Sequence, residues 1–354
     1  MLQCDQHGLP SRREWGRTLE HAGRPDIRGF RIDPAMLDKQ RRQFIVGSAL
    51  GAAGLVWTNA LCAASRSDTI ALVLKSMSDP FTRTMIDAAQ AFQKHYPHPF
   101  QLVVDGCATE TDADGQISIV GNLISQRVSA IVLAPADSKA LIPVTSECIG
   151  RGIITLTIDN PLDPDALNAA GVHVPFVGPD NRRGARLVGS YLASKLHRGD
   201  QVGIVEGVPG SRNAQQRTAG FTDEMKAAHV QVVALEAGDW EYDKGRLAAS
   251  TILARKPEIR ALLCGNDNMA MGAGDAVRAA KKTGAVFITG YNNSDAIKPL
   301  LKNGRILATV DQFAAKQAVY GVDVALQALL QQQKQGDLPA FIQTPLTLVT
   351  RTSA

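Results

Sequence analysis

The sequence predicts an α/β protein with two lobes, each built on a doubly wound parallel sheet. Short runs rich in Val, Ile and Leu recur along the chain with little polar alternation, as expected of strands buried on both faces. Segments with apolar residues at helical spacing lie between these runs, and repeated strand–helix units build parallel sheets. The 354 residues are enough for two domains, and ten expected strands fit two lobes better than one sheet.

The expected strands follow one another along most of the chain. They comprise residues 69–74, 100–105, 130–135, 153–159, 173–178, 201–207, 230–235, 259–265, 286–290 and 306–310. The first helix should begin directly after the first strand, because Asp79 is a favoured N-cap residue and Pro80 suits the first helical position. Apolar residues recur at helical spacing in 114–130, 182–196 and 269–282.

The N-terminal region is predicted to be an export signal. Arg41 and Arg42 precede an uncharged run, 44–57, and small residues follow it. This order is typical of a secretory signal peptide, with cleavage expected near residues 63–64. The paired arginines resemble the twin-arginine signal of bacteria, although Gln40 stands where Ser or Thr is usual, so the general secretory route stays open.

Residues 1–35 fit poorly in front of such a signal, because they are rich in Arg and lack periodicity. Met36 opens a normal signal start, so we expect residues 36–64 to be the signal and 1–35 to be an untranslated or disordered extension. A DNA-binding headpiece would need a helix-turn-helix pattern, which we do not find there. Cys62 would permit a lipoprotein, but a leucine precedes it where a small residue is expected.

Composition and motifs exclude several functions. Residues 65–354 hold 29 Lys and Arg against 28 Asp and Glu, which gives no basic face for nucleic acid. No GxGxxG follows the first strand, and we find no GxSxG or P-loop, so an enzyme is not expected. The five cysteines form no CxxC or metal-ligand spacing, so we expect no cofactor. Cys107 and Cys148 could pair in an oxidising compartment.

Polar residues follow the expected strands at the edge where ligands bind in such sheets. They lie in residues 78–81, 134–138, 159–160, 208–217, 236–245, 265–268, 291–293 and 311–312. Asp, Asn, Gln and Arg side chains grip sugar hydroxyls, and aromatic rings stack on apolar sugar faces. Some of these residues also suit purely structural roles, since Asp79, Asp137 and Asp180 could be helix caps and Asn292 could form a turn.

The ordered motifs resemble those of periplasmic sugar-binding proteins of ABC importers, of the ribose-binding type, over about residues 68–350. The motifs are TIALVLKSMSDPF, NLISQRVSAIVLAPADSKAL, TIDN, GPDNRRGARLVGSYL, VEGVPGSRNAQQRTAGF, DWEYDKG, GNDNMAMGA, ITGYNNSDAIK and GRILATVDQ. The resemblance implies the type 1 periplasmic binding protein fold, with two lobes joined by three hinge strands. Crossovers near Gly178, Gln312 and Pro345 would make the N-terminal lobe 68–178 plus 313–344 and the C-terminal lobe 179–312 plus 345–354.

The resemblance also implies which residues bind the sugar. Phe81 and Trp240 would stack on opposite sugar faces, and Arg217 would donate two hydrogen bonds. The remaining side chains expected to bind hydroxyls are Asp79, Asp159, Asn160, Asn266, Asn292 and Gln312.

Three departures from the family pattern bear on the choice of sugar. Asn160 stands where the ribose binder has arginine, Asn292 replaces a common aspartate, and Thr82 replaces a second aromatic residue. These changes would remove charge-assisted hydrogen bonds and widen the floor of the cleft. We therefore expect a neutral hexose, ketose or sugar alcohol rather than ribose.

The function implied is capture rather than chemistry. The protein would act in the periplasm, as a monomer, and deliver its neutral monosaccharide or polyol to an ABC permease in the inner membrane. A ligand-loaded partner of a chemoreceptor or sensor kinase would bind the same sugar, so this alternative stays open. Sugar-responsive transcription factors share the fold, but the headpiece that they need is missing.

Overall fold

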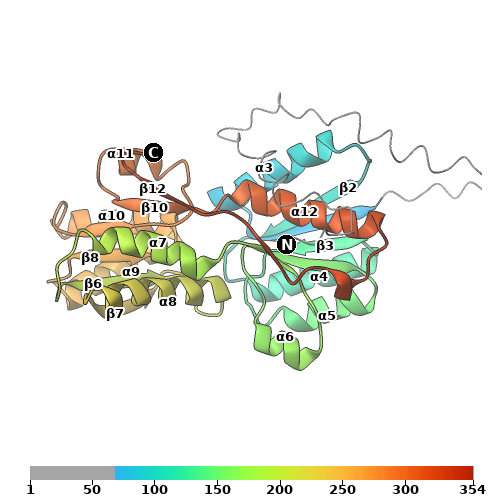
Figure 1. Cartoon of the computed structure of the whole chain (residues 1–354), viewed down its shortest axis with the longest axis horizontal. Coiled ribbons are helices and arrows are strands. Elements are labelled where there is room, and N and C mark those ends of the chain that lie inside the picture. The colour runs from blue at the N-terminus through green and yellow to red at the C-terminus, as the bar shows by residue number, and fades with distance from the viewer. Residues whose placement is uncertain (1–67, 354) are drawn as a thin grey trace, which may run out of the picture. The chain divides into compact units, whose positions relative to one another are not determined.

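The computed structural model describes residues 68–353, whose strands form two six-stranded sheets (Figure 1). We call the sheet that contains the first strand, together with its helices, the first lobe. Its elements are β1 (Thr69–Ser76), α3 (Pro80–His95), β2 (Gln101–Cys107), α4 (Ala113–Gln126), β3 (Ala130–Leu133), α5 (Ile142–Gly150), β4 (Ile154–Ile158), α6 (Pro164–Ala170), β5 (Phe176–Gly178), α12 (Ala314–Leu330), the 3₁₀ turn η2 (Gln335–Asp337) and β11 (Phe341–Gln343). The strand order is β11-β5-β4-β3-β1-β2, and all neighbours pair in parallel.

The second lobe contains the other sheet and its helices. Its elements are α7 (Asn181–Ala193), β6 (Gln201–Glu206), α8 (Arg212–Ala227), β7 (Gln231–Ala237), α9 (Tyr242–Arg255), β8 (Ala261–Cys264), α10 (Asp267–Ala279), β9 (Phe287–Thr289), α11 (Lys298–Lys302), β10 (Ala308–Asp311) and β12 (Thr347–Thr350). The strand order is β12-β10-β9-β8-β6-β7, with only the β10–β12 pair antiparallel.

The chain passes between the two sheets three times. It leaves the first lobe after β5, returns to it after β10, and crosses again between β11 and β12. The second crossing brings α12 back to the first lobe, where it packs beside α3 (Figure 1). The carboxyl ends of the parallel strands in both lobes therefore meet near these crossings, where the candidate site lies.

Each central strand is apolar because it serves two cores at once. In β1, Ile70 and Leu72 pack into the core under α3 and α12, while Ala71 and Val73 pack into the core on the opposite face. Successive side chains of a strand point to opposite faces. The uninterrupted apolar runs in the sequence follow directly from this double burial.

Every one of the ten expected strands overlaps a strand of the structure. The expected strand at 173–178 is shorter, because β5 begins only after Pro175, whose nitrogen has no hydrogen for the ladder. Two further strands, β11 and β12, were not among the expected ones. They contain three and four residues, are partly exposed, and lie at sheet edges, so neither forms a buried apolar run.

Cys107 and Cys148, whose pairing the sequence left open, do not form a disulfide in the structure. Both thiols are free and buried, as is that of Cys264. The expected signal at 36–64, the start at Met36 and the extension 1–35 lie outside the described residues. Within residues 68–353, the structure has no helix whose length and apolar character would let it cross a membrane.

Candidate functional site

A cavity lies where strand ends of the two lobes face each other, and the empty space there, about 310 Å³, includes space open to solvent. The first lobe contributes residues around the ends of β1, β2 and β4, and the second lobe contributes residues after β6, β7, β8 and β9. The lining residues are Lys75, Asp79, Phe81, Thr82, Glu110, Asp159, Asn213, Arg217, Trp240, Asn266, Asn292 and Gln312. Eight of the nine residues expected to bind the ligand are among them, and Asn160 is not.

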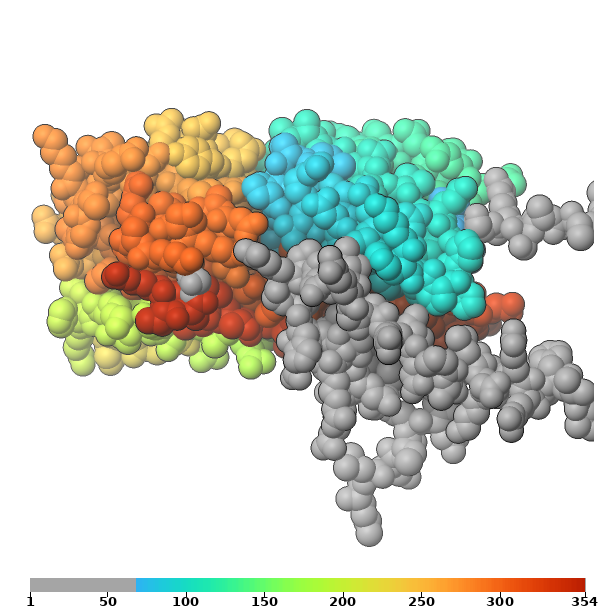
Figure 2. Space-filling model, turned by 90° about the horizontal axis from the view of Figure 1, so that it is seen from above, coloured from blue at the N-terminus to red at the C-terminus, as the bar shows by residue number. Residues whose placement is uncertain are grey.

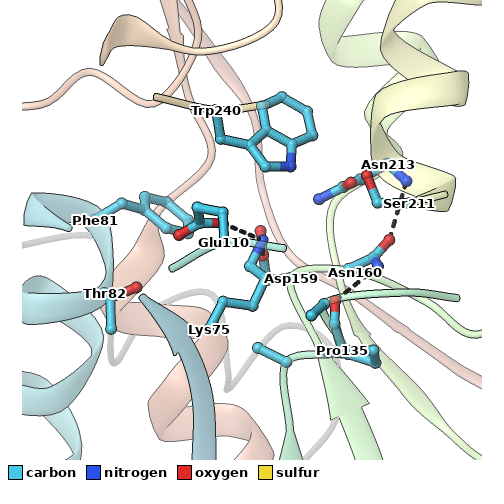
Figure 3. Close-up of polar contacts among 12 residues, drawn as sticks. Lys75, Phe81, Thr82, Glu110, Pro135, Asp159, Asn160, Ser211, Asn213 and Trp240 are labelled. Carbon is cyan, nitrogen blue, oxygen red and sulfur yellow. Dashed lines mark hydrogen bonds and ion pairs between the residues drawn. The ribbon is translucent and has the colours of Figure 1, made fainter. Parts of the chain in front are cut away.

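The first-lobe wall carries a buried ion network. Lys75, at the end of β1, lies 2.7 Å from Asp159 after β4 and 3.3 Å from Glu110 in the turn after β2. Burial alone would lower the pKa of Lys75, but the two carboxylates outweigh it and raise that pKa. Burial raises the pKa of Glu110, with Lys75 opposing the shift. Lys75 is therefore held as a cation, and its carboxylate partners face the cavity beside it (Figure 3).

Asp79 caps its helix, as the sequence suggested, and its second carboxylate oxygen contacts the facing lobe. Its Oδ1 accepts hydrogen bonds from the backbone N–H groups of Phe81 and Thr82, so it caps α3. Its Oδ2 accepts a hydrogen bond from Asn268 of the second lobe. In Figure 2 the blue start of α3 accordingly meets the orange surface of the second lobe. The cap thus also contacts the facing lobe.

A second hollow of about 700 Å³ lies on the other side of this contact. It shares Asp79, Glu110 and Trp240 with the cavity, and Asn268 also lines it. The shared side chains form the wall between the two spaces. The side chains of Asp159, Arg217 and Trp240 are almost fully buried, so a ligand can enter the cavity only if the lobes move apart. The structure is therefore a closed form.

Arg217, on α8, is held in place by three hydrogen bonds. Its Nε donates to Asn181, its Nη1 to the backbone oxygen of Gly265, and its Nη2 to Gln312. Burial lowers its pKa, while the charges of Asp159 and Asp267 oppose that shift. A guanidinium carries five N–H donors, so these three bonds leave capacity for a ligand.

Trp240 forms an aromatic wall of the cavity in the second lobe. Its ring lies 5.2 Å from the Arg217 guanidinium carbon and 5.9 Å from the Lys75 ammonium. The ring lies so close to Gly207 that a Cβ there would come within 2.0 Å of a ring atom. Figure 3 shows Trp240 across the cavity from the Lys75 cluster, with Phe81 of the first lobe also facing this space.

The cavity also collects backbone conformations that are uncommon for residues other than glycine. Asp159, Trp240 and Asn292 have φ angles of 61°, 69° and 130°. Such conformations cost of order 1–3 kcal/mol each and cluster at functional sites. Here they turn side chains from three different strand exits toward one space.

Amide side chains complete the second-lobe wall. Asn266 caps α10 through its Oδ1 and donates from Nδ2 to the backbone oxygen of Trp240. Asn292 accepts from Gln312 over 2.7 Å, and Gln312 in turn accepts from Arg217. The buried Oδ1 of Asn213 has no hydrogen-bond partner within the described residues and is available to a ligand donor.

Asn160 does not line the cavity, although the resemblance predicted a contact with sugar. It is fully buried, donates from Nδ2 to the oxygen of Pro135, and accepts from the backbone N–H of Asn213. Sequence reasoning missed two charged lining residues, Lys75 and Glu110, which join the expected Asp79, Asp159 and Arg217.

The chain matches the model of the periplasmic binding protein domain over residues 70–334. It belongs to the periplasmic binding protein family. The D-ribose/D-allose-binding protein of Pseudomonas aeruginosa is 53% identical over 281 residues, which cover 79% of this chain and 88% of that protein. The D-allose-binding periplasmic protein of Escherichia coli is 31% identical over 73% of this chain and 83% of its own length.

Solved structures of periplasmic binding proteins agree with this assignment. An ABC transporter solute-binding protein from Burkholderia multivorans, holding an unknown ligand, is 56% identical with a TM-score of 0.78, covering 80% of this chain and 99% of that one. One from Actinobacillus succinogenes with bound D-allose is 29% identical with a TM-score of 0.75, covering 81% and 99%. The expected fold and the expected class, a sugar-binding component of ABC import and not an enzyme, are confirmed.

Proposed function

We propose that this protein encloses one neutral monosaccharide or polyol in the cavity between its lobes and presents it to an ABC permease in the inner membrane. D-Allose and D-ribose are the first candidates, because the relative that is 53% identical is named for both, although the sequence favoured a hexose over ribose. The observation that carries the proposal is the lining itself, in which charged donors and acceptors alternate around an aromatic wall.

The lining suits hydroxyl groups in particular, because each hydroxyl both donates and accepts a hydrogen bond. Lys75 and Arg217 supply donors, while Asp159, Glu110 and the free Oδ1 of Asn213 supply acceptors. Hydrogen bonds to charged groups are roughly twice as strong as neutral ones. The apolar face of a sugar ring would stack on Trp240.

The charge of the lining favours a neutral ligand. Asp79, Glu110 and Asp159 oppose two cations, Lys75 and Arg217. A sugar acid would bring a further negative charge next to Asp79 and Asp159, and burial already raises the pKa of Glu110 in the same wall. Like charges in such a buried space repel each other strongly.

We also propose that the three crossings act as the hinge, as the resemblance implies. The first-lobe body would be 68–178 plus 313–344, and the second 179–312 plus 345–354. The division of the strands between two sheets supports these limits. Closure of two lobes around a ligand is a common use of such a hinge.

The periplasm is the proposed site of action, reached through the signal at 36–64 by the twin-arginine or general secretory route. We propose a monomer. Intact mass of the protein recovered from the periplasm, with a first residue near position 65, would support this processing. A mature chain that retains residues 1–35 would contradict it.

The proposed function is tested by the melting temperature of the purified protein with D-allose, D-ribose, myo-inositol, D-fucose and a sugar acid. A ligand that binds only the folded state stabilises it by about 2.7 kcal/mol at a concentration one hundred times its Kd. We expect a concentration-dependent rise with one or two neutral sugars and none with the acid. A well-folded protein that responds to none of the neutral compounds would contradict the proposal.

A further inference from the structure

Helix α8, which carries Arg217, begins without a cap of its own. The first N–H groups of a helix have no partner within the helix and need one elsewhere. Ser211 occupies the N-cap position, but its side chain forms no capping hydrogen bond. Its hydroxyl donates instead to the backbone oxygen of Val208.

The missing caps come from the first lobe. The N–H of Arg212 donates to Ser138 Oγ over 2.8 Å, and the N–H of Asn213 donates to Asn160 Oδ1 over 3.1 Å. A backbone hydrogen bond from Ser138 N to the oxygen of Gly210 runs beside them. Figure 3 shows the Asn160–Asn213 contact on the side of the cavity opposite Phe81.

Both first-lobe oxygens are fixed before they meet the helix. Asn160 donates from Nδ2 to Pro135, so its Oδ1 is directed at α8. The hydroxyl of Ser138 donates to the oxygen of Pro161, which leaves its lone pairs for Arg212. Ser138, Asn160 and Asn213 are each at most 3% exposed. Such burial makes the loss of a hydrogen-bond partner costly.

We propose that Ser138 and Asn160 form a latch that caps α8 only when the lobes are closed, and thereby strengthens sugar binding without contacting the sugar. This inference takes the ligand from the proposed function. The contact of Ser138 and Asn160 with α8 can be tested without any ligand. Opening the lobes takes both oxygens away from α8. Closure therefore completes the helix that positions Asn213 and Arg217 in the cavity.

A close approach at Gly210 provides an independent way to test the latch. A Cβ on Gly210 would lie 2.1 Å from Oδ2 of Asp137 in the first lobe. The other oxygen of Asp137 accepts from the N–H groups of Lys139 and Ala140, which restrains its carboxylate. Gly210→Ala should therefore obstruct the closed form while it leaves each lobe intact.

The test compares wild type with Ser138→Ala, the double variant Ser138→Ala/Asn160→Ala, and Gly210→Ala. Ser125→Ala on the exposed surface of α4 is the matched control. Loss of a helix cap should raise the Kd for D-allose or D-ribose roughly three- to thirtyfold, mainly through faster release.

Small-angle X-ray scattering over a sugar titration that includes zero sugar measures closure directly. We expect a smaller closed fraction in the double variant and in Gly210→Ala than in wild type and Ser125→Ala. Equal closed fractions at every concentration would overturn the latch. If wild type binds no sugar, the proposed function fails, and the zero-sugar comparison alone decides on the latch. If the double variant does not fold, Ser138→Ala alone decides on the latch, and Gly210→Ala serves as the reference for an obstructed closed form.

Discussion

The two lobes face the same cavity with different chemistry. The first lobe presents one cation, Lys75, and three carboxylic side chains, of which Glu110 and Asp159 both pair with Lys75. The second presents a single charged group, Arg217, together with amides and an indole ring. The first wall is thus held by ion pairs, and the second by hydrogen bonds to neutral backbone and amide oxygens.

The two walls should therefore contribute differently to the stability of the protein and to its affinity for a ligand. The first-lobe network exists within one lobe and is complete before closure. The groups of the second lobe lie on α8 and on loops, and one of them, Asn213, receives a hydrogen-bond partner from the first lobe only in the closed form. Removal of a charge should therefore damage the first lobe itself, whereas changes in the second lobe should act mainly on the bound state.

The largest effect is expected from Asp159→Ala, which removes the nearer carboxylate from Lys75. Removing one partner of a buried ion pair costs about 3–5 kcal/mol. We expect a lower melting temperature without sugar and an affinity loss of about 100-fold or more. Asp165→Ala, at an exposed site on α6, is the control. An unchanged melting temperature for Asp159→Ala would contradict the proposed importance of the network.

Arg217→Lys should have the next largest effect, and mainly on affinity. Lysine keeps the charge but loses the planar fork that reaches Asn181, Gly265 and Gln312 together. We expect a Kd for D-allose or D-ribose about 10- to 100-fold higher by calorimetry. Arg83→Lys on the exposed side of α3 serves as the control. Equal affinity for wild type and Arg217→Lys would show that the planar guanidinium of Arg217 does not contribute to ligand binding.

Gly207→Ala should have a smaller effect, because it moves the Trp240 ring instead of removing it. The new methyl group would overlap the ring, so the indole must shift. We expect an affinity loss of about tenfold, since stacking depends on ring placement. Gly121→Ala on α4, where a methyl group meets no neighbour within 4 Å, should leave affinity unchanged. Identical tryptophan fluorescence and affinity in Gly207→Ala and wild type would refute the displacement.

The smallest effect on affinity is expected from Asp267→Asn, because Asp267 lies behind the cavity. Burial raises its pKa from 3.8 to about 6, while hydrogen bonds from Thr309 and Ser294 oppose the shift. The folded state then binds the proton more tightly, so the stabilisation is complete below about pH 4 and is lost as the pH rises through about 6. Melting temperatures between pH 4 and 7 should fall more steeply in wild type than in Asp267→Asn. Parallel curves would contradict this assignment.

Much of the fold could be predicted, because strands buried on both faces leave continuous apolar runs. β11 and β12 could not, since short strands at sheet edges need no such runs. Eight of the residues that the resemblance implied line the cavity. They lie together because the carboxyl ends of parallel strands converge at one edge of a sheet. Their roles in binding stay predictions.

The missed residues show what a sequence leaves undetermined. Lys75 lies within β1, where the expected strand had already ended at Leu74. Glu110 lies in a turn after β2, and this strand exit was not among the polar segments expected to bind a ligand. Asp159 and Asn160 are adjacent, yet one faces the cavity and the other faces Pro135 and α8. The positive φ of Asp159 sets these directions, and residue type alone does not reveal it.

The central claim is that one neutral sugar occupies the cavity between the ion network and Trp240. Isothermal titration of the wild-type protein with D-allose and D-ribose, in parallel with Asp159→Ala, tests it most directly. We expect saturable binding of one sugar per chain in wild type and loss of this binding in Asp159→Ala. Binding that survives unchanged in folded Asp159→Ala, or a wild type that binds neither these nor any other neutral sugar, would contradict it.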